Sequence, residues 1–207
     1  MQSVEVRPLP RMLSQPSPAS AISMNAASPI MSSGPRANLF SARDIYEILR
    51  ERRWLESIAA PSDALTHWSE RAAALLGPQA ADRAALAELL GLIFHYDAAA
   101  ILQTPAIHAV LSREGARDVI RELALLILEG PAVDSERFKI IITTIKSRLP
   151  CTGRELFYPV RLALAGRPGG GELDRVILLL DDASTTPGLA PVKNVRQRML
   201  EFCAALD

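Results

Sequence analysis

The chain has 207 residues, 49% of them apolar, and its 23 basic side chains balance its 23 acidic ones. This composition excludes disorder of the whole chain, and the zero net charge excludes a uniformly polycationic nucleic-acid coat. No uncharged apolar run approaches the ~18 residues that a membrane-spanning helix needs. Two cysteines are too few for a disulfide framework, so we expect a reducing compartment and a cytoplasmic location.

Residues 1–38 differ in composition from the rest of the chain. They contain six of the 15 prolines, eight serines and four of the five methionines, and they show no apolar period. Such a segment buries too little surface to offset its ordering entropy, so we expect a disordered Pro/Ser-rich tail. It lacks the apolar segment of a secretory signal. Two alternatives stay open, a transit peptide and a true start at Met24 or Met31.

From residue 39 to residue 207 the sequence predicts an all-α domain, a compact cage or bundle of about eight to nine helices. Ser41 is a capping residue for the first helix, and Pro61-Ser62 opens a second helix that Gly77-Pro78 stops. Apolar residues that recur at positions i, i+3, i+4 and i+7 predict the remaining helices. These cover residues 86–94, 105–111, 116–127, 138–149, 159–164, 173–180 and 195–206.

The segment 138–149 is ambiguous, because its β-branched run from Ile140 to Thr144 is also typical of a strand. The helical period and the cap signal Asp134-Ser135 favour a helix. No pair of alternating segments flanks an Asn-Gly type turn, so nothing predicts a sheet.

Motifs for catalysis or cofactors are missing from the sequence. It has no P-loop and no His-Glu-x-x-His zinc motif, and Gly166–Gly171 follows no predicted strand, so it indicates a turn between helices. We therefore expect no cofactor and no metal. An enzyme that uses Cys151 is a minor hypothesis. Cations flank this residue, which favours a reactive thiolate, but no histidine lies near it in sequence.

A local excess of positive charge lies between Glu136 and Arg167. The segment holds seven basic and two acidic residues, so its net charge is +5 in a neutral chain. Such cations can neutralise phosphates, and Tyr158, beside Phe157, can stack on an unpaired base. The alternative is a solvated face with charges that complement helix C-termini, for example at Lys146 and Arg148.

The segment 152–173 resembles the end of the anticodon-binding domain of bacterial glutamyl-tRNA synthetases. That family reads roughly Lys-Gly-Lys-x-Leu-Phe-His-Pro-Leu-Arg-x-Ala-Leu-Thr-Gly-Arg, then Gly-Pro-Glu-Leu. The matching positions are Leu156, Phe157, Pro159, Arg161, Ala163, Leu164, Gly166, Arg167, Glu172 and Leu173. A weaker similarity extends over roughly residues 80–182. The departures are Tyr158 for the histidine, Ala165 for the threonine and Thr152-Gly153-Arg154 for Lys-Gly-Lys.

The resemblance implies a non-catalytic module that binds the anticodon stem-loop of tRNA in protein biosynthesis, alone or beside a separate synthetase chain. The family's ATP-binding core requires a His-x-Gly-His type signature and a Lys-Met-Ser-Lys-Ser type loop, and this chain has neither. We expect the chain alone not to be an enzyme. The RNA-binding candidates are Lys146, Arg148, Arg154, Tyr158, Arg161 and Arg167.

The alternative function is a helical protein-protein interaction module that has lost RNA binding and contacts a synthetase or another protein.

The role of Arg161 is also open. This residue, expected near the start of a helix at Pro159, needs an anionic partner, because the helix dipole repels a cation there. That partner is either an RNA phosphate or an internal acid such as Glu172.

Overall fold

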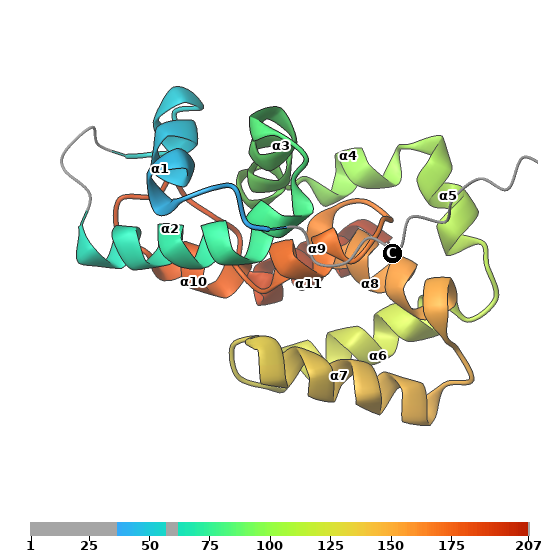
Figure 1. Cartoon of the computed structure of the whole chain (residues 1–207). Coiled ribbons are helices and arrows are strands. Elements are labelled where there is room, and N and C mark those ends of the chain that lie inside the picture. Colours follow the sequence, from blue (N-terminus) through green and yellow to red (C-terminus); the bar gives the residue numbers. More distant parts are fainter. Residues whose placement is uncertain (1–36, 57–61, 207) are drawn as a thin grey trace, which may run out of the picture. The chain divides into compact units, whose positions relative to one another are not determined.

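The computed structural model describes residues 37–56 and 62–206, and every regular element in these ranges is helical (Figure 1). The α-helices are α1 (Ala42–Glu51), α2 (Asp63–Leu76), α3 (Arg83–Phe94), α4 (Ala98–Leu102), α5 (Pro105–Leu111), α6 (Ala116–Leu128), α7 (Ser135–Arg148), α8 (Gly153–Ala165), α9 (Glu172–Ile177), α10 (Leu180–Thr185) and α11 (Val195–Leu206). One 3-10 turn, η1 (Gly77–Gln79), follows α2. The predicted all-α fold is confirmed.

The expected tail falls outside the described residues, apart from Ala37 and Asn38. The Asn38 side-chain amide donates a 3.1 Å hydrogen bond to the carbonyl oxygen of Ala73 in α2. Ser41 caps α1 as predicted, in a capping box with Asp44. None of the helices in residues 37–56 and 62–206 is long and apolar enough to cross a membrane.

Three features of the helices differ most from the prediction. The short helix α4, which Asp97 caps, was not predicted, because its five residues are too few to show a period. Helix α8 begins at Gly153 and not at Pro159, so Pro159 lies inside the helix. The predicted helix 173–180 is two helices, α9 and α10.

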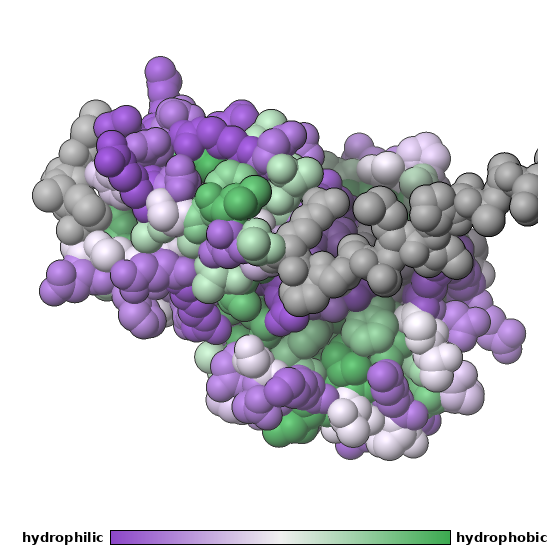
Figure 2. All heavy atoms as spheres, viewed as in Figure 1, coloured by the Kyte–Doolittle hydropathy of each residue, from purple (hydrophilic) through white to green (hydrophobic). Residues whose placement is uncertain are grey.

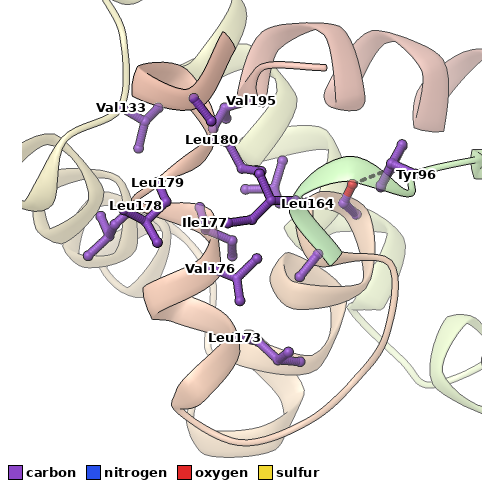
Figure 3. Close-up of a cluster of buried hydrophobic side chains, with 14 of the residues drawn as sticks. Tyr96, Val133, Leu164, Leu173, Val176, Ile177, Leu178, Leu179, Leu180 and Val195 are labelled. Atoms are coloured by element: carbon purple, nitrogen blue, oxygen red, sulfur yellow. Dashed lines mark hydrogen bonds between the residues drawn. The ribbon is translucent and has the colours of Figure 1, made fainter. Parts of the chain in front are cut away.

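The break between α9 and α10 follows from burial. Val176 to Leu180 are five consecutive apolar residues, and all of them are buried. One continuous helix buries only the stripe that faces its neighbour. Helix α9 instead packs among α2, α3 and α8, and Figure 3 shows Leu164 of α8 among side chains of α9 and α10. Turning the chain at Leu178 lets successive residues enter the core.

The C-terminal end of α8 is held by two side chains from elsewhere in the chain. The Arg198 guanidinium of α11, which is fully buried, donates from Nη1 to the Leu164 carbonyl at 2.8 Å. The hydroxyl of Tyr96, which precedes α4, donates to the Ala163 carbonyl at 2.5 Å (Figure 3). These bonds fix the position of the helix that carries three of the six predicted binding residues, Arg154, Tyr158 and Arg161.

Candidate nucleic-acid interface

The predicted binding residues lie on α7, on α8 and just beyond α8. Lys146 and Arg148 occupy the last turn of α7, Arg154 the first turn of α8, and Arg167 follows Gly166, which ends α8 in the left-handed conformation at φ +83°. These four side chains are exposed. Gly166 serves this turn because residues with a Cβ adopt that φ at a cost.

Two aromatic residues are half-buried in the middle of α8. The Phe157 ring has two cations over it, with Lys146 Nζ 5.6 Å and the Arg161 guanidinium carbon 4.8 Å from the ring centroid. The neighbouring ring of Tyr158 has the guanidinium carbon of Arg113 at 5.9 Å. The candidate site thus combines cations with aromatic faces, which is the composition that single-stranded RNA contacts require.

Arg113 was not among the residues predicted from sequence. It lies 45 positions before Tyr158, in the loop between α5 and α6, and it lies outside the local excess of positive charge. Only the folded chain brings it to Tyr158, so no local pattern could have identified it.

Arg161 is engaged within the protein. Its Nε and Nη2 atoms donate to the two carboxylate oxygens of Asp174, each at 2.8 Å, and Nη1 donates to the Gly169 carbonyl at 2.6 Å. The side chain is only 11% exposed. A largely buried bidentate pair of this kind has strong geometric specificity. Arg161 therefore fastens the glycine-rich loop and α9 to α8.

The internal acid that pairs with Arg161 is Asp174, and the prediction of Glu172 was wrong. The Glu172 carboxylate accepts a hydrogen bond from the Gly170 amide at 2.9 Å and does not pair with Arg161. The argument from the helix start was also wrong, because Arg161 is the ninth residue of α8 and not near its N-terminus. Burial, not the helix dipole, accounts for the need for an acid.

Four of the seven cations in residues 136–167 form ion pairs or hydrogen bonds within the protein. Among the seven cations of residues 136–167, Lys139 pairs with Glu136, Arg148 with Glu122 and Arg161 with Asp174. Arg137 donates to the Leu126 carbonyl at 2.9 Å. Within the described residues, Lys146, Arg154 and Arg167 form no ion pair, so we name these three the unpaired cations.

Cys151 is buried beside this site. Burial raises the pKa of its thiol, and the nearby Glu155 carboxylate acts in the same direction. A thiol with a raised pKa is a poor nucleophile at neutral pH, so the structure lends no support to catalysis by Cys151. The described residues also bring together no group of three or more His, Cys, Asp or Glu side chains that could hold a metal ion.

The surface between α7 and α8 is not uniformly charged. In Figure 2, hydrophobic residues reach the surface there between hydrophilic ones. Ile140, on the outer face of α7, is 54% exposed. The surface between α7 and α8 thus carries unpaired cations and half-buried rings, and α7 also exposes the aliphatic Ile140.

Comparison with known proteins relates part of this chain to glutamate–tRNA ligases. Over 88 residues, 42% of this chain and 18% of the relative, it is 33% identical to glutamate–tRNA ligase 2 of Syntrophus aciditrophicus (strain SB). Over 74 residues, 36% of this chain and 15% of the relative, it is 32% identical to the glutamate–tRNA ligase of Carboxydothermus hydrogenoformans.

The chain thus contains a region related to glutamate–tRNA ligases, and that region spans less than a fifth of the length of either relative. No protein-family profile matches the chain. No solved structure matches it either.

Proposed function

We propose that the domain formed by residues 39–207 is a non-catalytic tRNA-binding module of the anticodon-binding type, which holds an anticodon stem-loop alone or beside a separate synthetase chain. The observation that carries the proposal is the region related to glutamate–tRNA ligases. The surface that carries Lys146, Arg154, Phe157, Tyr158 and Arg167, which we name the α7–α8 face, supports the proposal. Its cations can contact phosphates, and its aromatic rings can stack on unpaired bases.

In this proposal the six predicted residues have different roles. Lys146, Arg154 and Arg167 contact phosphates, and Arg148 joins them when its exposed pair with Glu122 opens, since such pairs are worth at most about 1 kcal/mol. Tyr158 stacks on an unpaired base. Arg161 acts indirectly, by holding the loop that precedes α9 in place through Asp174 and Gly169.

A salt titration tests the proposal. We expect a labelled bulk tRNA to bind the full chain at low salt, and we expect the affinity to fall as salt rises. Replacing all three unpaired cations by glutamine should reduce the slope of log K against log salt by about 2, because each contact to single-stranded RNA contributes roughly 0.7.

A charge-matched control separates a specific site from the loss of net charge. Arg50, Arg52 and Arg196 are exposed and form no ion pair in residues 37–56 and 62–206. Their triple glutamine variant changes the net charge equally and should bind tRNA with nearly the original slope. Equal losses in both triple variants, or no binding by the unmutated protein, would rule out an interface on α7 and α8.

A protein-interaction module is the second candidate. It is favoured by the exposed aliphatic side chains Ile140 and Leu125, on α7 and α6, and by the internal use of four of the seven cations. On this view, replacing Ile140 by aspartate abolishes capture of a synthetase chain, while the three unpaired cations can be replaced without effect.

A further inference from the structure

A cavity of about 640 Å³ opens between α5, the start of α6 and the end of α11. Its volume lies within the range of pockets that hold small ligands. Apolar side chains of Leu102, Leu111 and Leu206 form part of its lining, and His108, Arg113 and Arg117 supply positive or ionisable groups. Such a lining suits a ligand with an apolar face and an anionic group.

The cations of the cavity are available to a ligand. In the described part of the chain, neither Arg113 nor Arg117 forms an ion pair. The one acid in the lining, Asp118, has Arg121 beside it, with Nη1 and Oδ1 3.6 Å apart. The cap position of α6 is Gly115, which has no side chain to accept hydrogen bonds from the first-turn amides. All of these features favour an anion over a cation.

Arg113 connects the cavity to the α7–α8 face. Arg113 lines the cavity and also lies over the ring of Tyr158, the residue assigned above to stacking on an unpaired base. An RNA strand that passes over Tyr158 therefore meets Arg113 next, at the edge of the cavity.

We propose that this cavity receives one unpaired nucleotide of the RNA that binds the α7–α8 face. Its phosphate contacts Arg113 and Arg117, and its base lies against Leu102, Leu111 and Leu206. The inference rests on the proposed function, because the proposed occupant belongs to the RNA that binds the α7–α8 face. It adds the cavity between α5, α6 and α11 to the binding site.

Two substitutions with matched controls test the cavity in the full-length protein. Ala205→Phe fills the cavity without changing charge, and Ala204→Phe adds the same ring at an exposed neighbour that does not line it. Arg117→Gln removes a cation of the cavity, and Arg196→Gln removes an exposed cation of α11 that does not line it. The probe is a labelled hairpin RNA with an unpaired loop, and the readout is its dissociation constant at low salt.

We expect Ala205→Phe and Arg117→Gln each to weaken binding by at least about fivefold, since one stacked base or one charged contact is typically worth that much. The two controls should stay within about twofold, and all four variants should keep the original melting temperature. Suppose that both cavity variants keep the original affinity while replacement of the unpaired cations still reduces the salt slope. That result overturns the proposal that the cavity binds a nucleotide, and it leaves the proposed function standing. Absence of RNA binding by the unmutated chain overturns both.

Discussion

The guanidinium of Arg198 lies over the ring of Tyr96, with its carbon 4.6 Å from the ring centroid, and both residues are buried. Within residues 37–56 and 62–206, Arg198 forms no ion pair with a carboxylate. It donates instead to backbone carbonyls of Leu92 and Ile93 at the end of α3, of Leu164 near the end of α8, and of Lys193 before α11. A cation is favourable at helix C-termini because the backbone dipole is negative there.

We predict that Arg198→Met destabilises the domain by about 3 kcal/mol or more, because several buried carbonyls lose a charged donor at once. Burial lowers the pKa of Arg198 to about 10, so the guanidinium is still charged at neutral pH. Chemical unfolding at pH 7 measures the effect. Arg196→Met, an exposed change on the same helix, should stay within about 0.5 kcal/mol. An equal loss in both variants would contradict the role given to Arg198.

The phenol of Tyr96 should titrate later than an ordinary tyrosine. Burial raises its pKa well above the usual 10, and the positive charge of Arg198 only partly opposes this effect. A group with a raised pKa in the folded state stabilises it fully below the unfolded value, and that contribution is lost as the pH rises through the folded value. The ultraviolet titration of the folded protein should therefore lack one phenolate near pH 10, and Tyr96→Phe should remove the late transition.

The cap of α1 gives a prediction with a smaller expected effect. Hydrogen bonds from the Ser41 side chain and backbone lower the pKa of Asp44, so the ionised carboxylate stabilises the capping box. The contribution of the ionised Asp44 to stability is present above about pH 4, and it is lost as the pH falls through the lowered pKa of the folded state. Ser41→Ala should cost about 1 kcal/mol at pH 7, measured by thermal unfolding. The difference from the unmutated protein should shrink in acid, and a constant difference would argue against the capping box.

Local signals explain which elements were predicted correctly. The caps at Ser41 and Asp134 and the stop at Gly77 act within one helical turn, so they can be recognised from a few neighbouring residues. The β-branched run from Ile140 forms a helix because Ile141, Ile142 and Ile145 share one buried face of α7. Period and cap outweigh intrinsic β-propensity in this segment.

Pairing over long distances explains what the sequence did not reveal. Tyr96 and Arg198 are 102 positions apart, and neither residue stands out locally. Asp174 was missed as the partner of Arg161 because Glu172 lies closer in sequence, but Glu172 folds back onto the Gly170 amide. The start of α8 was placed too late because proline favours the first turn of a helix, whereas here tertiary packing tolerates Pro159 inside it.

The boundary of the N-terminal segment can be tested by truncation. Removing residues 1–36 should leave the melting temperature almost unchanged, because the prediction from composition places no core residue there. Removing Ala37 and Asn38 as well takes away the bond to the Ala73 carbonyl and should lower stability by about 1 kcal/mol. Differential scanning fluorimetry on both truncated chains measures the two steps. A large loss on the first truncation would show that the segment packs against the domain.

The pair between Arg161 and Asp174 gives the most discriminating prediction. Removing either partner leaves the other charge largely buried, so Arg161→Met and Asp174→Asn should each cost up to about 3–5 kcal/mol. The double variant should cost much less than the sum, because the two side chains contact each other directly. Glu172→Gln, the matched control, should stay near the unmutated stability.

The same variants separate an indirect role of Arg161 from a direct RNA contact. If Arg161 only holds the loop in place, Asp174→Asn and Arg161→Met should weaken tRNA binding to a similar extent and leave the salt slope nearly unchanged. A direct phosphate contact predicts a different pattern, in which Arg161→Met alone lowers the slope by roughly 0.7. In that case Asp174→Asn frees the guanidinium and strengthens binding. Salt titrations of the two variants, at a temperature where both remain folded, therefore decide how this arginine serves the interface.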